Sequence, residues 1–430
     1  MLASPMTYAD AYAYLLALPQ FKGTRPDTYA LDGIRALLEG MGQPQESYPV
    51  LHIAGTNGKG STASMAAAVL RAGGVNVGLH TSPHLWYMGE RMRVNGVPAS
   101  KPWIAEAVAQ WRPLFERVQP SFFEATVALS FRYFAEQSVD LAVIEVGLGG
   151  RLDATNVVTP LAALITTIGL DHTAILGETH AAIAAEKAGI VKPGVPTFTT
   201  VQHPEALAVI QQAAEAQGSL FHNVRARTAL TPHPDGSITL QTPHHTYANL
   251  TLGLAGAHQH WNAALAVHTL EETHPDLTTA HMREGIANVG GLAGLRGRLD
   301  VLQQTPLVVA DVAHNADGLE RALAWIQDRG VGRLTVALGW MRDKDFAPAG
   351  DALRRARAQV FPVHIDSPRA LPTATLIQHL RDANIPTLAS TGTAREAWSQ
   401  FSASAMPRDA LLIAGSHQVV AQLRPDRFSS

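Results

Sequence analysis

A glycine-rich loop with one lysine is the clearest chemical feature of the sequence. The run Gly55-Thr56-Asn57-Gly58-Lys59-Gly60-Ser61 follows the apolar segment Val50–Ala54 and precedes an alanine-rich stretch, Thr62–Ala72. Backbone N–H groups of such a turn, with a helix N-terminus behind them, form a nest for anions, and a lysine within it neutralises nucleotide phosphates. Gly60 separates Lys59 from Ser61, so the loop departs from the usual Gly-Lys-Ser/Thr ending. The alternative is an ordinary strand-to-helix turn, but the flanking strand and helix favour phosphate binding.

Polar residues also follow other apolar runs, at the points where strands are expected to end. Glu145 lies in the run Leu141–Val146, His172 follows the run Leu161–Ile168, and Ser82 follows a shorter run. Ligands of a parallel sheet gather outside the carboxyl ends of its strands, and Mg²⁺ prefers hard oxygen ligands. Each residue alone is more often a helix cap or an ordinary surface group. Together with a phosphate loop, they predict a Mg²⁺–nucleotide site.

Four further residues could take part in the same chemistry. Lys187 lies near the end of an alanine-rich helical stretch, where a solvated charge is the usual role, although its neighbours are unusually apolar. Asp311 and His314 follow the apolar run Leu307–Ala310, and Arg298 lies beside an expected hinge. An arginine at a hinge can reach phosphates only when two domains close, which would protect a reactive intermediate from water.

The elements that must position these residues are short apolar runs that alternate with helical stretches. Runs that are apolar on both faces indicate a parallel sheet covered on both sides, so the predicted class is α/β. The expected strands are Val50–Ala54, Leu141–Val146, Leu161–Ile168, Leu307–Ala310, Leu334–Leu338 and Leu411–Ala414. Residues Asn223–Thr251 alternate in polarity around Pro234-Asp235-Gly236, which predicts an antiparallel hairpin or small sheet. The glycine-rich segment Gly290–Gly294 predicts domains of residues 1–294 and 295–430.

Composition limits the classes of protein to consider. The chain has 430 residues, 46% of them hydrophobic and 16% charged, which suits two or three domains with sizeable cores. The net charge of -3 provides no basic excess for nucleic acid, and the absence of cysteine excludes disulfides and thiolate chemistry. No signal peptide is recognisable and no apolar run approaches the ~18 residues of a membrane span. We therefore expect a cytoplasmic protein without nucleic-acid or membrane partners.

Taken together, the motifs resemble the folylpolyglutamate synthase family of Mur-type ligases over nearly the whole chain. Most of the specificity comes from Gly55–Ser61 (GTNGKGS) together with Glu145–Asn156 (EVGLGGRLDATN). The other matching segments, in chain order, are Ser82–His84, Glu90–Arg93, Phe122–Glu124, Asp171–Thr173, Glu186–Gly189, His258–Ala263, Arg298, Asp311–Asn315, Asp343–Asp345 and Gly415-Ser416. The resemblance implies a Mur-ligase-type P-loop ATPase domain, with a mostly parallel sheet and a small antiparallel subsheet. A smaller Rossmann-like α/β domain would follow, with the active site in the cleft between the two.

The resemblance also implies roles for individual residues. The ATP phosphates would be held by Thr56, Asn57, Gly58, Lys59, Gly60 and Ser61, with further ATP contacts from Asn262, Arg298 and Asp311. Mg²⁺ would be ligated by Ser82, Glu145 and His172. Lys187 would be carbamylated by CO₂, His314 would lie near the incoming glutamate, and a monovalent cation such as K⁺ is a further candidate cofactor.

The implied reaction joins L-glutamate to dihydropteroate, tetrahydrofolate or both, through an acyl phosphate, in a monomeric enzyme. Bifunctional members bind dihydropteroate through three segments, which match Ala30-Leu31-Asp32, Ser121-Phe122-Phe123-Glu124 and Leu152-Asp153-Ala154. One alternative is a folylpolyglutamate synthase without dihydrofolate synthase activity. Another Mur-type amino-acid ligase is disfavoured by Gly60 and by the run Leu148–Asn156. A P-loop nucleotide switch would not need the functional residues expected in the second domain.

Overall fold

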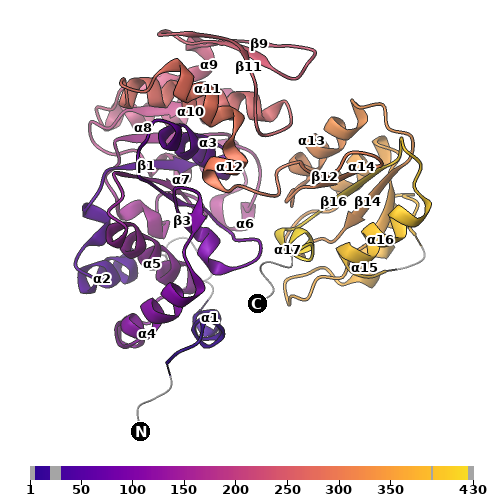
Figure 1. The fold of residues 1–430 in the computed structure, drawn as a ribbon, viewed down its shortest axis with the longest axis horizontal. Coiled ribbons are helices and arrows are strands. Elements are labelled where there is room, and N and C mark those ends of the chain that lie inside the picture. The colour runs from indigo at the N-terminus through magenta and orange to yellow at the C-terminus, as the bar shows by residue number, and fades with distance from the viewer. Residues whose placement is uncertain (1–4, 20–30, 389–390, 425–430) are drawn as a thin grey trace. The chain divides into compact units, whose positions relative to one another are not determined.

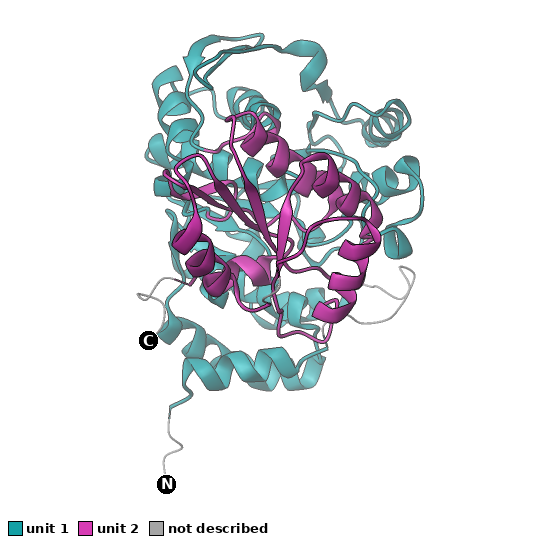
Figure 2. Cartoon of the chain, turned by 90° about the vertical axis from the view of Figure 1, so that its right-hand side faces the viewer, with its two compact units in different colours: residues 1–253, 259–295 teal, residues 254–258, 296–430 magenta. Residues whose placement is uncertain are grey.

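The computed structural model describes residues 5–19, 31–388 and 391–424, which form two compact units (Figures 1 and 2). Unit 1 comprises residues 1–253 and 259–295, and unit 2 comprises residues 254–258 and 296–430. The predicted division was into residues 1–294 and 295–430. It placed the short segment Leu254–His258 in the first domain, whereas the structure groups this segment with unit 2. Within the described ranges, no helix is both long and apolar enough to cross a membrane.

Unit 1 is built on a mixed eight-stranded sheet of order β4-β3-β2-β5-β1-β6-β7-β8. Its strands are β1 Val50–Ala54, β2 Val77–His80, β3 Met92–Val94, β4 Val97–Pro98, β5 Leu141–Glu145, β6 Ala162–Ile165, β7 Thr197–Thr199 and β8 Phe221–Asn223. All neighbours from β2 to β8 pair in parallel, whereas β3 and β4 are antiparallel additions at one edge. Every residue of β1, β5 and β6 is buried, as expected for strands covered on both faces. The α/β prediction is confirmed.

Helices cover both faces of this sheet (Figure 1). In chain order they are α1 Tyr8–Ala17, α2 Asp32–Gly40, α3 Lys59–Ala72, α4 Lys101–Val118, α5 Phe122–Glu136, α6 Thr173–Leu176, α7 His180–Ala188, α8 Pro204–Ala216, α9 Val224–Arg227, α10 His258–Thr273, α11 Thr279–Ala287 and α12 Val289–Ala293. One apolar cluster joins α1, α2, α4 and α5, and another joins β1 and β6 to α7 and α8. These clusters fix the carboxyl ends of the central strands, where the predicted functional residues lie.

A small antiparallel sheet of order β11-β10-β9 follows β8. Its strands are β9 Ala229–Pro232, β10 Ile238–Gln241 and β11 Thr246–Leu250. The turn between β9 and β10 has Gly236 at φ 85°, and Asp235 accepts hydrogen bonds from the backbone and side chain of Ser237. The prediction of a small antiparallel sheet is confirmed, although its expected first residues form the short helix α9.

Unit 2 contains a five-stranded sheet of order β12-β13-β16-β14-β15. Its strands are β12 Asp300–Gln303, β13 Leu307–Ala310, β14 Leu334–Leu338, β15 Gln359–Pro362 and β16 Ala410–Ala414. Only β12 is antiparallel to its neighbour. The helices are α13 Ala316–Gln327, α14 Ala347–Arg355, α15 Thr373–Asp382, α16 Ala394–Ser404 and α17 His417–Ala421. Parallel strands connected by helices give this unit the expected Rossmann-like character.

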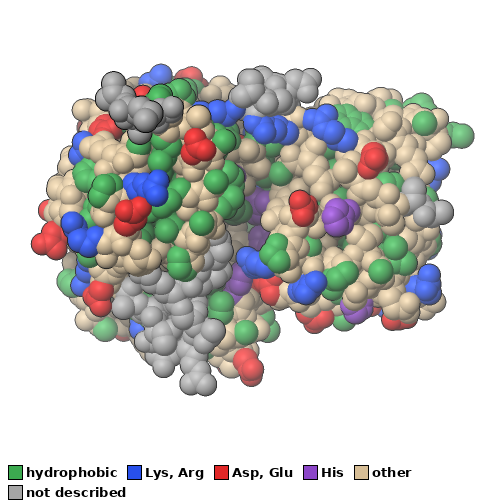
Figure 3. Space-filling model, turned by 90° about the horizontal axis from the view of Figure 1, so that it is seen from below, with side chains coloured by type: hydrophobic (Ala, Val, Ile, Leu, Met, Phe, Trp, Pro, Cys, Tyr) green, Lys and Arg blue, Asp and Glu red, His purple; other side chains and the backbone are tan. Residues whose placement is uncertain are grey.

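Charged side chains of both signs are interspersed over the face of the molecule drawn in Figure 3. This mixture agrees with the small net charge of -3. Neither sign of charge dominates this face, so its charge does not by itself indicate a binding site.

Candidate active site

The phosphate loop connects β1 to α3 and is folded around its own lysine. Gly58 has φ 87°, a left-handed conformation that glycine adopts without strain, and it directly precedes the helix. The Lys59 ammonium donates hydrogen bonds to the carbonyl oxygens of Gly55, at 3.0 Å, and Thr56, at 3.1 Å. The lysine charge and the N-terminus of a 14-residue helix therefore lie at one end of the loop. This arrangement is suited to binding a chain of phosphates.

Two threonines after β6 hold the loop in place. Thr166 and Thr167 donate side-chain hydrogen bonds to the carbonyl oxygen of Asn57, at 2.7 and 3.0 Å. The backbone N–H of Thr56 donates to the carbonyl oxygen of Thr167, at 2.7 Å. A Cβ atom on Gly55 would lie 1.8 Å from the Thr166 hydroxyl, so the loop needs glycine there. Neither threonine was predicted to be functional, because in the sequence both continue the apolar run Leu161–Ile168 that was expected to be a strand.

Helix α10 supplies a second contact to the loop. Asn262 is buried, and its side-chain oxygen would lie 2.5 Å from a Cβ atom on Gly58. The Asn262 amide donates to Gln259, at 2.8 Å, and Gln259 donates to the Ser61 hydroxyl, at 3.4 Å. Gly60 and Ser61 lie buried in the first turn of α3. The structure thus brings Asn262, predicted to contact ATP, against the phosphate loop.

The predicted metal ligands lie at or just beyond the carboxyl ends of β2, β5 and β6. Glu145 is the last residue of β5 and is buried, and its Oε2 accepts a 2.9 Å hydrogen bond from the backbone N–H of Ser82. His172 lies beyond the end of β6, at the N-terminus of α6, with φ 51°. Its backbone N–H donates to the carboxylate of Asp171, at 2.8 Å. The Glu145 carboxylate and the Ser82 hydroxyl are oxygen donors of the kind that Mg²⁺ prefers, whereas His172, which follows β6, two strands from β5 in the sheet, offers a nitrogen.

Lys187 lies in the last turn of α7 with only 4% of its surface exposed. Burial, reinforced by the positive charge of Lys59, lowers the pKa of Lys187 to about 7, while Asp171 and Asp153 act in the opposite direction. A Cβ atom on Gly150 would lie within 3.0 Å of the Lys187 backbone, so this end of α7 packs directly on the loop after β5. The charge of Lys59 in the phosphate loop therefore acts on Lys187, and the end of α7 lies against the loop that follows Glu145. The usual role of a lysine near a helix C-terminus, a solvated surface charge, therefore does not apply to Lys187.

The predicted substrate segment at the start of α5 combines a helix cap with two aromatic rings. Ser121 and Glu124 form a capping box, in which the Glu124 carboxylate accepts from the Ser121 backbone, at 2.7 Å, and hydroxyl, at 2.8 Å. The guanidinium of Arg91 lies 5.2 Å from the ring centre of Phe122, which is buried, whereas Phe123 is partly exposed. Ser121 and Glu124 therefore position the helix start, and the two rings are the groups suited to contact a flat heterocycle.

Asp153 shapes the loop that follows β5. It is buried, and it accepts 2.9 Å hydrogen bonds from the backbone N–H groups of Leu148 and Thr155. Burial raises the pKa of Asp153, and these hydrogen bonds oppose the rise. Leu152 is partly exposed and Ala154 is buried on either side of it. The carboxylate thus holds the Leu152–Ala154 segment in a fixed conformation.

The remaining predicted substrate segment spans the start of α2. Ala30 lies outside the described residues, whereas Leu31 precedes the helix and Asp32 is its first residue. A carboxylate in the first turn is stabilised by the helix dipole, which accounts for Asp32 locally.

In unit 2, the predicted residues gather around the carboxyl end of β13. The buried Asp311 carboxylate accepts hydrogen bonds from the backbone N–H groups of Leu299, at 2.8 Å, and Ala313, at 2.7 Å. Burial raises the pKa of Asp311, and the nearby charge of Arg298 opposes this rise. A ring nitrogen of His314 lies 3.0 Å from the carbonyl oxygen of Val312. Asp311 thus fastens the segment that carries Arg298 to the end of the sheet.

Comparison with known proteins gives matches in both units. The Mur ligase middle domain matches residues 53–270, and the Mur ligase, glutamate ligase domain matches residues 297–417. The chain is 35% identical to the dihydrofolate synthase/folylpolyglutamate synthase of Bacillus subtilis, over 88% of this chain and 89% of that protein. It is 34% identical to a probable bifunctional folylpolyglutamate synthase/dihydropteroate synthase of Haloferax volcanii. That match includes 97% of this chain but only 50% of the relative, so this chain spans about half of the relative's length.

A solved structure also matches almost end to end. It is the bifunctional folylpolyglutamate synthase/dihydrofolate synthase of Yersinia pestis complexed with AMPPNP and Mn ion. The TM-score is 0.86 at 27% identity, covering 98% of this chain and 97% of that one. With both Mur ligase domains matched and the likeness extending over most of its length, the chain belongs to the folylpolyglutamate synthase family of Mur ligases.

Proposed function

We propose that this chain is an ATP- and Mg²⁺-dependent ligase that joins L-glutamate to the carboxylate of dihydropteroate, of tetrahydrofolate, or of both. The observation that carries the proposal is the grouping of Lys59, Glu145 and Lys187 at one edge of a buried parallel sheet. Lys59 is folded into a phosphate loop, Glu145 is held by Ser82, and Lys187 is electrostatically coupled to Lys59. The named activities of the relatives identify the class of acid and amine.

The chemistry requires activation of a poor acyl donor. Transfer of the ATP γ-phosphoryl group to the acceptor carboxylate gives an acyl phosphate and ADP. The glutamate amine then attacks the acyl carbon, loses a proton, and expels phosphate to leave an amide. Bound Mg²⁺ would neutralise charge on the transferred group, with Ser82, Glu145 and His172 as its ligands. No protein nucleophile is needed, which agrees with a chain that has no cysteine.

The residues of this chain would position the reactants and exclude water. Lys59 and the loop N–H groups would bind the phosphates, and Asn262 would contact ATP beside the loop. Residues 1–294 would thus hold ATP and the pterin acid, and residues 295–430 would bring glutamate through His314. Arg298 and Asp311 belong to this second part, so their approach to ATP would accompany closure of the two domains. K⁺ would be a further cofactor.

The acceptor range is tested by ATP-dependent incorporation of ¹⁴C-glutamate with dihydropteroate and tetrahydrofolate in parallel reactions. We expect activity with both acids, because Phe122 and Phe123 provide aromatic surface and Asp153 holds the adjacent loop. Incorporation with tetrahydrofolate and none with dihydropteroate would restrict the enzyme to polyglutamate synthesis. Incorporation with neither acid would refute the proposed function.

Replacement of Arg298 by alanine is expected to lower kcat by about a thousandfold, as for arginines that stabilise a transferred phosphoryl group. ATP affinity measured without acceptor should change little, because unit 1 alone provides the phosphate loop. Arg296→Ala is the matched control, since Arg296 is partly exposed and paired with Asp300 at 2.8 Å. A large loss of ATP affinity with kcat intact would instead make Arg298 a contact of the resting complex.

A further inference from the structure

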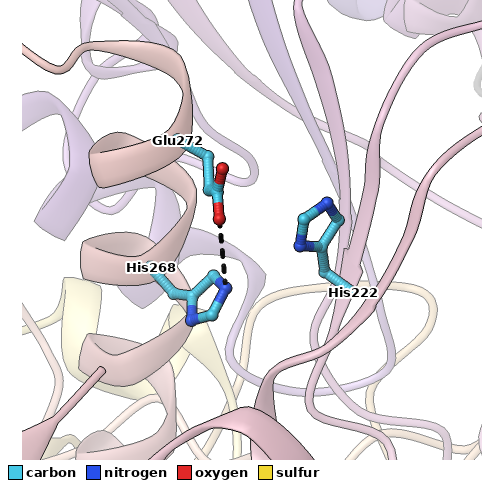
Figure 4. Close-up of side chains that lie close together, drawn as sticks. All are labelled: His222, His268 and Glu272. Atoms are coloured by element: carbon cyan, nitrogen blue, oxygen red, sulfur yellow. Dashed lines mark ion pairs between the residues drawn. The ribbon is translucent and has the colours of Figure 1, made fainter. Parts of the chain in front are cut away.

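A second cluster of possible metal ligands lies in unit 1, outside the residues assigned above. His222 belongs to the edge strand β8, and His268 and Glu272 lie one turn apart in α10 (Figure 4). One ligand atom from each of the three residues lies within 4.8 Å of the other two. Figure 4 shows a ring nitrogen of His222 facing His268 and Glu272. We propose that these three residues bind a divalent transition-metal ion of the Zn²⁺ type.

His268 has the environment of a metal-binding imidazole. Its side chain is fully buried, and within the described chain its Nε2 atom makes no hydrogen bond. Nε2 lies 3.9 Å from a carboxylate oxygen of Glu272, which is too far for a hydrogen bond but suited to two ligands of one ion. The other ring nitrogen lies 3.4 Å from the Thr228 hydroxyl. A proton on that nitrogen would leave the Nε2 lone pair directed toward the cluster.

The protonation state of His268 also suits a metal ligand. Burial is the largest cause that lowers the pKa of His268, to about 4, and the positive charge of Arg227 acts in the same direction, against the opposing effect of Glu272. The imidazole is therefore neutral at pH 7, as metal binding requires.

One ring nitrogen of His222 already accepts a hydrogen bond from a positively charged group, the guanidinium of Arg227. Arg227 Nη1 lies 2.6 Å from His222 Nδ1. A guanidinium can only donate, so Nδ1 is the unprotonated nitrogen of His222. Arg227 is exposed, and its side chain can move into water without leaving a buried charge. A metal ion would take its place at Nδ1, which makes Arg227 a competitor for the site.

A further histidine contacts one of the three proposed ligands. His244 lies in the turn between β10 and β11, and its Nε2 is 3.1 Å from the Glu272 carboxylate. Zn²⁺ favours four nitrogen and oxygen ligands, and two histidines with one glutamate are a known set, completed here by His244 or water. Two of the three ligands here are histidines, whereas the proposed set at Glu145 has one, and Mg²⁺ prefers oxygen ligands, so the two sites would differ in selectivity. A bound ion would link β8, α10 and the β10–β11 turn.

The test uses the full chain, stripped of metal with EDTA and titrated with Zn²⁺ in excess Mg²⁺, which keeps the Glu145 site filled. Calorimetry should show one Zn²⁺ per chain. The Tm should rise by about 5 °C at a hundredfold excess over Kd, with no such rise for Mg²⁺ alone. Co²⁺ in place of Zn²⁺ should give the visible absorption of a four-coordinate complex.

Variants distinguish this site from adventitious binding. Glu272→Gln and His268→Gln should each weaken Zn²⁺ binding by at least about a hundredfold, since even outer-sphere partners contribute up to that factor. Arg227→Gln should strengthen binding, because it removes the competing cation. His245→Gln is the matched control, a partly exposed histidine paired with Glu271, and should bind as the unchanged chain does.

Unchanged Tm values without metal would establish that these variants fold. Absence of stoichiometric Zn²⁺ binding, or binding that persists in Glu272→Gln, would overturn the proposal. Binding that is lost in Glu145→Gln and kept in Glu272→Gln would also overturn it, by assigning the ion to the other site.

Discussion

Replacement of Lys187 by alanine is expected to abolish glutamate ligation while leaving the chain folded. Lys187 is buried and its pKa is lowered to about 7, so a large neutral fraction exists at ordinary pH. A neutral amine adds to CO₂ and releases a proton, which gives a carbamate with two hard oxygens suited to a Mg²⁺ site. An unmodified ammonium would instead place a positive charge near Lys59 and repel the metal. We expect at least about a thousandfold loss of turnover, the upper range for one preorganised electrostatic group.

Further variants separate carbamylation from simple charge. Lys187→Arg should also be inactive, because the guanidinium keeps its charge and does not form a carbamate. Short carboxylic acids should partly restore the alanine variant by occupying the space of the carbamate. Lys192→Arg serves as the control, since Lys192 donates to the carbonyl oxygen of Asn156, at 3.1 Å, and has no proposed role in the reaction. Wild-type activity in Lys187→Arg would contradict the carbamate role.

The same lysine gives a pH dependence with a definite sign. The pKa of Lys187 is about 7 in the folded chain, below its ordinary value of 10.5, so the neutral amine forms as pH rises through 7. Reactivation of CO₂-depleted enzyme by added ¹³CO₂, followed by ¹³C NMR, should therefore be faster at pH 8 than at pH 6. Between pH 7 and 10.5 the Lys187 amine binds more protons in the unfolded chain than in the folded chain. The free energy of unfolding should therefore increase with pH across this range. No carbamate signal at any pH would contradict the modification.

Glu145→Gln is expected to lower turnover by at least about a hundredfold. Glutamine preserves the shape of the buried side chain at the end of β5 but removes the negative charge that would hold Mg²⁺. A titration of kcat against Mg²⁺ concentration should show that more Mg²⁺ is needed for half-maximal activity, and that the maximum is lower. Glu136→Gln makes the same chemical change at a surface pair with Arg132 and should have little effect. Near-normal turnover of Glu145→Gln at ordinary Mg²⁺ concentrations would exclude it as a metal ligand.

Several elements could be predicted because local sequence decides them. The strands Val50–Ala54, Leu307–Ala310 and Leu334–Leu338 have the predicted bounds, since continuous apolar runs between breakers can only be buried strands here. The strand expected at Leu161–Ile168 is shorter, Ala162–Ile165. Two residues of the predicted run beyond the observed strand, Thr166 and Thr167, instead hold the phosphate loop through side-chain hydrogen bonds. The pattern of apolar residues does not reveal such bonds. The helix expected to begin at Thr62 begins at Lys59, because the loop closes around its own lysine.

The motifs of the site could be predicted from the sequence, but the contacts between residues of different motifs could not. Nothing local indicates that Asn262 lies against Gly58, because the two are far apart in sequence and meet only through packing of α10. Likewise, Asp311 has the residue type of an ATP contact, but both of its oxygens accept backbone N–H groups. The spacing of His268 and Glu272, four residues apart in a helix, was a readable signal of a shared face. Its significance appears only when β8 brings His222 alongside.

Oxygen transfer reveals whether an acyl phosphate links ATP cleavage to amide formation. Tetrahydrofolate labelled with ¹⁸O in the reacting carboxylate is incubated with ATP, Mg²⁺, L-glutamate and the enzyme, and the released phosphate is examined by mass spectrometry. With an acyl-phosphate intermediate, we expect one ¹⁸O atom in each phosphate, and sustained ADP formation only when both the acid and glutamate are present. Phosphate without ¹⁸O, or equal ADP formation without glutamate, would contradict it.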